Sequence, residues 1–184
     1  MNNNENFKEV LEMLKDSLAN GRQPLLTVTS NSMSPLIKKG DQILLSNTST
    51  SQLSPGDIIT IEKEKYLLTH RLYCISESGT LSTRGDRPQQ FDSPTSIINL
   101  IGRVIAVKRK NKCLYLNKGL GKKLNDHIAW LASLEAKLLH KPASISSHQD
   151  KQSKWQIATR KTIYIWEQVL TTIVKTISSK RELS

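Results

Sequence analysis

Apolar positions near the amino terminus repeat with the spacing of one helix face. They fall at i, i+3, i+4, i+7 and i+11, and polar residues occupy the positions between them. Gly21 follows directly, where a helix would end. The pattern therefore predicts an amphipathic helix over residues 1–21 with this apolar face: Phe7, Val10, Leu11, Leu14 and Leu18.

The pattern changes between residues 25 and 116 to short apolar and β-branched runs that turn residues separate. Seven strands in about 90 residues leave no room for helical crossovers between most of them, so antiparallel pairing is expected. The fold class is therefore mainly β. The predicted strands are 25–29, 42–45, 57–61, 66–75, 80–83, 101–108 and 113–116.

Helical spacing returns in the last third of the chain. Ile128, Leu131, Leu134 and Leu138 predict one helix, and residues 156–178 predict a second helix with cations beside its apolar stripe. Residues 141–154 are polar and rich in serine, as in a linker. We therefore expect an amino-terminal helix (1–21), a β domain (22–117) and a basic helical extension (118–184).

The chain of 184 residues has 27 Lys and Arg against 16 Asp and Glu, a net charge of +11. Residues 1–100 hold 10 basic and 11 acidic residues, and residues 101–184 hold 17 and 5. The basic extension could contact an anionic membrane surface, bind an acidic partner, pack on the β domain, or simply be a solvated basic face. Nucleic acid is unfavoured, because the basic residues are not interleaved with aromatic residues as in a reader motif.

Several classes are excluded by what the sequence lacks. No apolar run approaches the roughly 18 residues of a membrane span, and the amino terminus has no signal-peptide pattern. We therefore expect a cytoplasmic location, with peripheral membrane contact as an open alternative. Cys74 and Cys113 stand alone and are expected to pack as small apolar groups, and we expect neither a metal site nor a cofactor.

One segment, Ser30-Asn31-Ser32-Met33-Ser34-Pro35, lies between a predicted strand and a turn. A hydroxyl at the end of a strand can be both exposed and rigid, as a nucleophile must be. Serine-rich turns are common, however, so residue type alone leaves a structural turn open.

Further segments, found in a consistent order along the chain, point to a resemblance with a known family. Ser32-Met33-Ser34-Pro35 resembles the nucleophile box of the S24/S26 serine peptidases, the clan of signal peptidase and LexA. The similarity extends over about residues 22–108 and includes two Gly-Asp strand starts, a general-base position and a closing Gly-x-Val strand. The matching segments are Gly40-Asp41, Pro55-Gly56-Asp57, Leu68-Thr69-His70-Arg71-Leu72, Thr83-Arg84-Gly85-Asp86 with Asp92 six residues on, and Gly102-Arg103-Val104.

The resemblance implies roles for five residues. Ser32 matches the nucleophile, and His70 stands where the endoplasmic-reticulum and archaeal type of signal peptidase has its general base. An imidazole suits that task, since its ordinary pKa is about 6.5. Asp92 matches the acid that orients the histidine, with Asp86 as the rival or as structural support. Ser30 matches a hydroxyl that assists the backbone N–H of Ser32 in binding the oxyanion.

The resemblance implies a signal-peptidase/LexA-like β fold and a serine endopeptidase that processes a peptide or protein precursor, in the manner of signal or leader peptides. A self-cleaving repressor is unfavoured, because the chain has no Ala-Gly or Cys-Gly dipeptide. The alternative is a catalytically inactive binding or adaptor module whose basic helices bind a membrane surface or an acidic partner.

Overall fold

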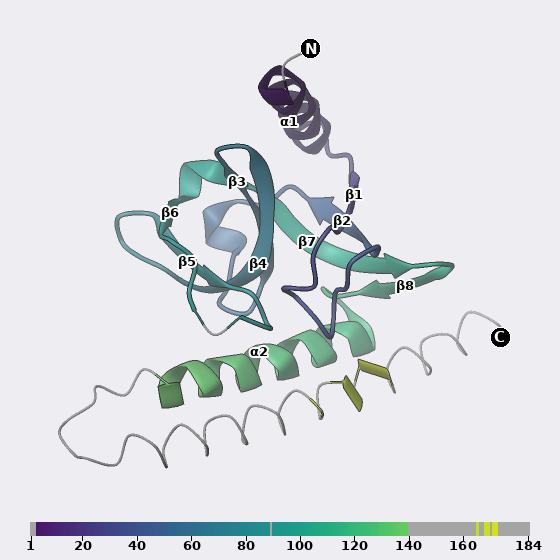
Figure 1. The fold of residues 1–184 in the computed structure, drawn as a ribbon, viewed down its shortest axis with the longest axis vertical. Coiled ribbons are helices and arrows are strands. Elements are labelled where there is room, and N and C mark those ends of the chain that lie inside the picture. Colours follow the sequence, from purple (N-terminus) through teal and green to yellow (C-terminus); the bar gives the residue numbers. More distant parts are fainter. Residues whose placement is uncertain (1–2, 89, 140–164, 166–167, 170, 173–184) are drawn as a thin grey trace.

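The computed structural model describes residues 3–88, 90–139, 165, 168–169 and 171–172. A single antiparallel sheet lies between two long helices (Figure 1). The helices are α1 (Asn3–Ala19) and α2 (Gly119–Leu139), and the strands are β1 (Leu25–Thr27), β2 (Gln42–Ser46), β3 (Ile58–Lys63), β4 (Tyr66–Ile75), β5 (Thr80–Arg84), β6 (Thr95–Ser96), β7 (Leu100–Arg109) and β8 (Lys112–Tyr115).

The expected mainly β fold with helices on either side of it in the sequence is confirmed, and each of the seven predicted strands is present. The bounds of β4 agree with the prediction, the other strands differ by one or two residues at one or both ends, and β6 was not predicted. The helix expected around residues 128–138 begins earlier, at Gly119. The linker 141–154 lies outside the described residues, and in the expected helix 156–178 the described positions are helical. The division into three segments stays a prediction.

The sheet has the order β1-β2-β7-β3-β4-β5-β6, with β8 also paired to β7, and all of these pairs are antiparallel. The central strand β3 pairs with β4 on one side, where Ile59 is opposite His70. Next along the sheet, β4 pairs with β5 so that Arg71 lies opposite Arg84. These registers place the middle of β4, which carries His70, beside the end of β5 and next to the loop that follows β1.

The two helices cover the main apolar core. Leu11, Leu14 and Leu18 of α1 are buried in it, as the spacing predicted, and α1 is followed by Gly21 at φ 73°. Leu124 and Ile128 of α2 join the same core. Among the described residues, no helix combines the length and apolar character needed to cross a membrane.

One of the two cysteines differs from expectation. Cys74 is exposed and Cys113 is half-buried, and neither forms a disulfide. Cys74 follows a register shift between β4 and β5, which turns its side chain outward instead of into the core. The expectation that both pack as apolar groups was therefore wrong for Cys74.

Candidate active site

Ser32 lies in the loop between β1 and β2, and the residues after it fix that loop to the core. Met33, Leu36 and Ile37 are buried, whereas Ser32 itself is only half-buried. The backbone N–H of Arg87 donates to the Ser32 carbonyl at 2.8 Å, which holds the loop from its other side. The hydroxyl of Ser32 is thus rigidly placed and accessible, as a nucleophile requires.

His70 is 5% exposed and reaches Ser32 from β4. Its Nε2 lies 3.0 Å from Ser32 Oγ, and its Nδ1 lies 2.7 Å from Asp92 Oδ2. Both separations are ordinary hydrogen-bond lengths. The three predicted residues therefore form one connected chain of side chains, although their catalytic roles stay predictions.

Asp92 lies in the loop between β5 and β6, and two bonds to Thr83 tie this loop to β5. The Asp92 amide donates to the Thr83 carbonyl at 2.9 Å, and the Thr83 hydroxyl donates to Asp92 Oδ2 at 2.7 Å. Burial alone would raise the pKa of Asp92, but the hydrogen bonds from His70 and Thr83, with the charges of His70 and Lys63, lower it below the ordinary value. Asp92 is therefore held as a carboxylate beside the imidazole.

Asp86 is the rival carboxylate, and it lies elsewhere in the network. Its two oxygens accept from Arg71 Nε at 2.7 Å and Nη2 at 2.8 Å. Both side chains are 1% exposed. Asp86 is thus paired with Arg71, and the carboxylate that reaches His70 is that of Asp92. The role of Asp86 stays a prediction.

Ser30 is the predicted oxyanion donor. Its Oγ lies 3.2 Å from Ser32 Oγ and accepts a long bond of 3.5 Å from the Ser32 amide. The hydroxyl therefore borders both the nucleophilic oxygen and the amide that the resemblance assigns to the oxyanion. Its contribution to catalysis stays a prediction.

Sequence reasoning assigned no role to Thr83, Gly85 or Arg71. Thr83 is the second hydrogen-bond donor to Asp92. Gly85 packs so closely that a Cβ there would lie 2.8 Å from the Ser32 carbonyl oxygen and 3.1 Å from His70 Nε2. All three residues lie in the motif segments quoted above, and this was the signal in the sequence that could have pointed to them. Their roles, however, depend on strand register.

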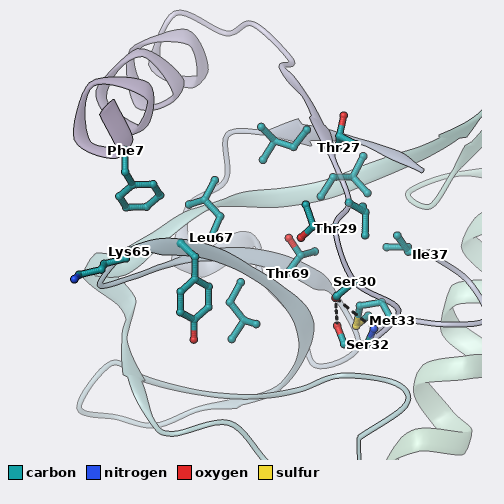
Figure 2. A pocket seen from close by; sticks show the side chains of 15 residues that line it. Phe7, Thr27, Thr29, Ser30, Ser32, Met33, Ile37, Lys65, Leu67 and Thr69 are labelled. Atoms are coloured by element: carbon teal, nitrogen blue, oxygen red, sulfur yellow. Dashed lines mark hydrogen bonds between the residues drawn. The ribbon is translucent and has the colours of Figure 1, made fainter. Parts of the chain in front are cut away.

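A cavity of about 420 Å³ extends from Ser32 along β1 and β4 toward α1. Figure 2 shows Ser30 and Ser32 at one end and Phe7 of α1, with Lys65 and Leu67, at the other. Most of the lining side chains are apolar: Phe7, Leu26, Val28, Met33, Ile37, Ile43, Tyr66, Leu67 and Leu68. A segment of peptide chain could lie in this cavity with its reacting bond at Ser32.

No group of three or more His, Cys, Asp and Glu side chains within the described part of the chain could hold a metal ion. The chemistry that these residues can supply is that of a hydroxyl, an imidazole and a carboxylate in line. That combination can activate a serine toward a carbonyl carbon.

Comparison with known proteins bears on the same part of the chain. No curated protein is similar enough to count as a match. The model of the family described as Peptidase S24-like matches residues 1–105, which include Ser32, His70 and Asp92 and extend into β7. Since this match covers more than half of the 184 residues, the chain belongs to the Peptidase S24-like family.

Proposed function

We propose that the protein is a serine endopeptidase that cleaves a peptide or protein precursor. The observation that carries the proposal is the continuous contact from Ser32 Oγ through His70 to Asp92, at 3.0 and 2.7 Å. Membership of a peptidase family supports it. The use of His as the base is the feature of the endoplasmic-reticulum and archaeal type of signal peptidase.

The geometry suggests a separate catalytic role for each of these residues. His70 Nε2 takes the proton from Ser32 as its oxygen attacks the carbonyl carbon, and then gives that proton to the departing amine. Asp92, ionised because its pKa is lowered, stabilises the imidazolium that forms. The Ser32 amide and the Ser30 hydroxyl donate to the developing oxyanion. Water then attacks the acyl group, with His70 as the base again.

The cavity supports a peptide substrate with apolar side chains near the cleaved bond. Its lining is largely apolar, and it runs along the strand edge of β1 and the start of β4. Apolar walls favour apolar side chains by removing their surface from water. We therefore propose that the substrate is an extended precursor segment, as in the processing of signal or leader peptides.

A serine-directed fluorophosphonate label tests the function without a known substrate. The wild-type protein should be labelled at Ser32, and Ser32→Ala should not be labelled. Ser78→Ala, in the exposed β4–β5 turn, is the matched control and should react like the wild type. If the wild type does not react, or reacts equally after Ser32→Ala, the inactive binding module becomes the better account.

A further inference from the structure

Helix α2 follows the residues that the family model matches, yet two polar side chains are buried on the face it turns to the sheet. The buried positions have the spacing of one helix stripe. They are Leu124, Asn125, Ile128, Leu131, Ala132 and Glu135. Asn125 is 6% exposed and Glu135 is 8% exposed. Burying such groups is costly unless they bind partners, so their partners indicate what α2 is built to hold.

Asn125 binds the arginine that follows His70 in the chain. Arg71 Nη1 donates to Asn125 Oδ1 at 2.8 Å and to the Gly56 carbonyl at 2.7 Å. The remaining edge of the same guanidinium holds Asp86. One buried group therefore joins α2, the turn before β3 and the loop that packs on Ser32.

Glu135 binds the arginine that follows Thr83. Arg84 is 0% exposed, and its Nη2 donates to Glu135 Oε2 at 2.9 Å and to the Ala132 carbonyl at 3.2 Å. Its Nε donates to the Tyr73 hydroxyl at 3.1 Å, and its Cζ lies 5.1 Å from the centre of that ring. A buried guanidinium needs such a charged partner, because an unpaired buried charge is strongly destabilising.

The two arginines lie directly opposite each other in the β4–β5 pair. Side chains of successive strand residues point to opposite faces, so His70 and Thr83 project from the face opposite Arg71 and Arg84. Helix α2 therefore binds, on the opposite face of the sheet, the two strand segments that carry His70 and Thr83, the residues bound to Asp92. Figure 1 shows α2 running across the molecule beneath β4 and β5.

We propose that Asn125 and Glu135 are positioning residues: by holding Arg71 and Arg84, α2 keeps His70 and Asp92 in the geometry that activates Ser32. The inference rests on the proposed peptidase function. It makes α2 a required part of the active enzyme, although the family match ends before it. Loosening either contact would let β4 and β5 shift relative to the serine loop, and shifts of about 1 Å can cost about 100-fold in rate.

The test uses Asn125→Leu and Glu135→Gln in the full chain. Neither is expected to unfold the protein, because Arg71 keeps Asp86 and because glutamine keeps an oxygen for Arg84. We expect the rate of fluorophosphonate labelling at Ser32 to fall about 10-fold in each variant. The downfield proton NMR signal of the His70 Nδ1–H bonded to Asp92 should weaken or shift as well. Lys122→Ala, in an exposed ion pair with Asp126 on the same helix, should change neither.

The NMR signal separates positioning from general stability, since it is recorded at a temperature where each variant is fully folded. Wild-type labelling rates in both variants would overturn the proposal. So would reduced rates with an unchanged His70 signal, because the effect would then bypass the His70–Asp92 pair. If the wild-type protein is not labelled at all, the peptidase function fails, and the NMR comparison alone still decides whether α2 positions the pair.

Discussion

Gly85→Ala is a sharp perturbation of the active site, because one methyl group would enter the contact between the serine loop and the histidine. Gly85 is buried at the end of β5. The added Cβ would lie 2.7 Å from Pro88 Cδ, 2.8 Å from the Ser32 carbonyl oxygen and 3.1 Å from His70 Nε2. Pro88 Cδ belongs to the proline ring and the Ser32 oxygen to the backbone, so neither atom can rotate away. The loop that carries Ser32 must therefore move away from the His70 imidazole.

Two opposing terms set the effect of Gly85→Ala on stability. Alanine restricts the unfolded chain more than glycine does, which stabilises the fold by about 0.4–1 kcal/mol where the backbone permits it. Forcing a methyl group into a packed site costs about 1–3 kcal/mol. The steric cost is the larger, so a net destabilisation of about 1–2 kcal/mol is expected. A shift of about half an ångström between Ser32 and His70 should lower reactivity by about 10-fold or more.

The assay is the rate constant for fluorophosphonate labelling of Ser32, measured beside the thermal unfolding of the same samples. Gln90→Ala, an exposed position in the same loop, is the control and should match the wild type in both. A wild-type labelling rate in Gly85→Ala would refute the reasoning. It would mean that the close approach of Gly85 to Ser32 and His70 has no part in holding the pair.

The remaining predictions concern the catalytic residues, Thr83, Asp92 and the basic extension. Ser32→Ala and His70→Ala should each abolish labelling and turnover while circular dichroism stays native-like. Thr83→Val removes a hydrogen bond to a carboxylate and should cost about 1–3 kcal/mol in urea unfolding. Because folding lowers the pKa of Asp92, its carboxylate stabilises the fold above about pH 4, and this contribution disappears as pH falls through the folded-state pKa. Asp92→Asn should therefore weaken the dependence of the free energy of unfolding on acid pH. An unchanged dependence would contradict the shift. Removing residues 155–184 should weaken binding to anionic vesicles if the basic extension contacts a membrane, whereas equal sedimentation of both forms would exclude it.

The sequence predicted the sheet well because its strands are separated by clear turn residues. The predicted and observed bounds of β4, Tyr66–Ile75, agree. The two-residue strand β6 has too few positions for any alternation to show, and it exists only through its pairing with Thr80 and Leu81. The start of α2 was missed because Gly119 and Gly121 weaken the helical signal in its first turn.

The candidate site was predictable as a set of residues but not as a set of contacts. Motif order indicated Ser32, His70 and Asp92, which lie up to 60 positions apart. Thr83 lies in a quoted segment but has no role there, and Asn125 lies outside all of them, since a threonine in a strand and an asparagine in a helix are ordinary. Their roles arise from the β4–β5 register and the docking of α2, which are tertiary properties.

The structure distinguishes the two aspartates by the positive group that each one meets. Asp86 faces the permanent charge of Arg71, and that fully buried pair is the same before and during the reaction. In the mechanism proposed above, Asp92 faces an imidazole that takes up the proton of Ser32 during the reaction. Only interactions that strengthen in the transition state accelerate the reaction, so the second carboxylate can contribute to catalysis in a way that the first cannot. Exchanging Asp92 for Asn should therefore lower the labelling rate in the folded protein, whereas Asp86→Asn should act first on stability, by leaving the Arg71 charge without its partner.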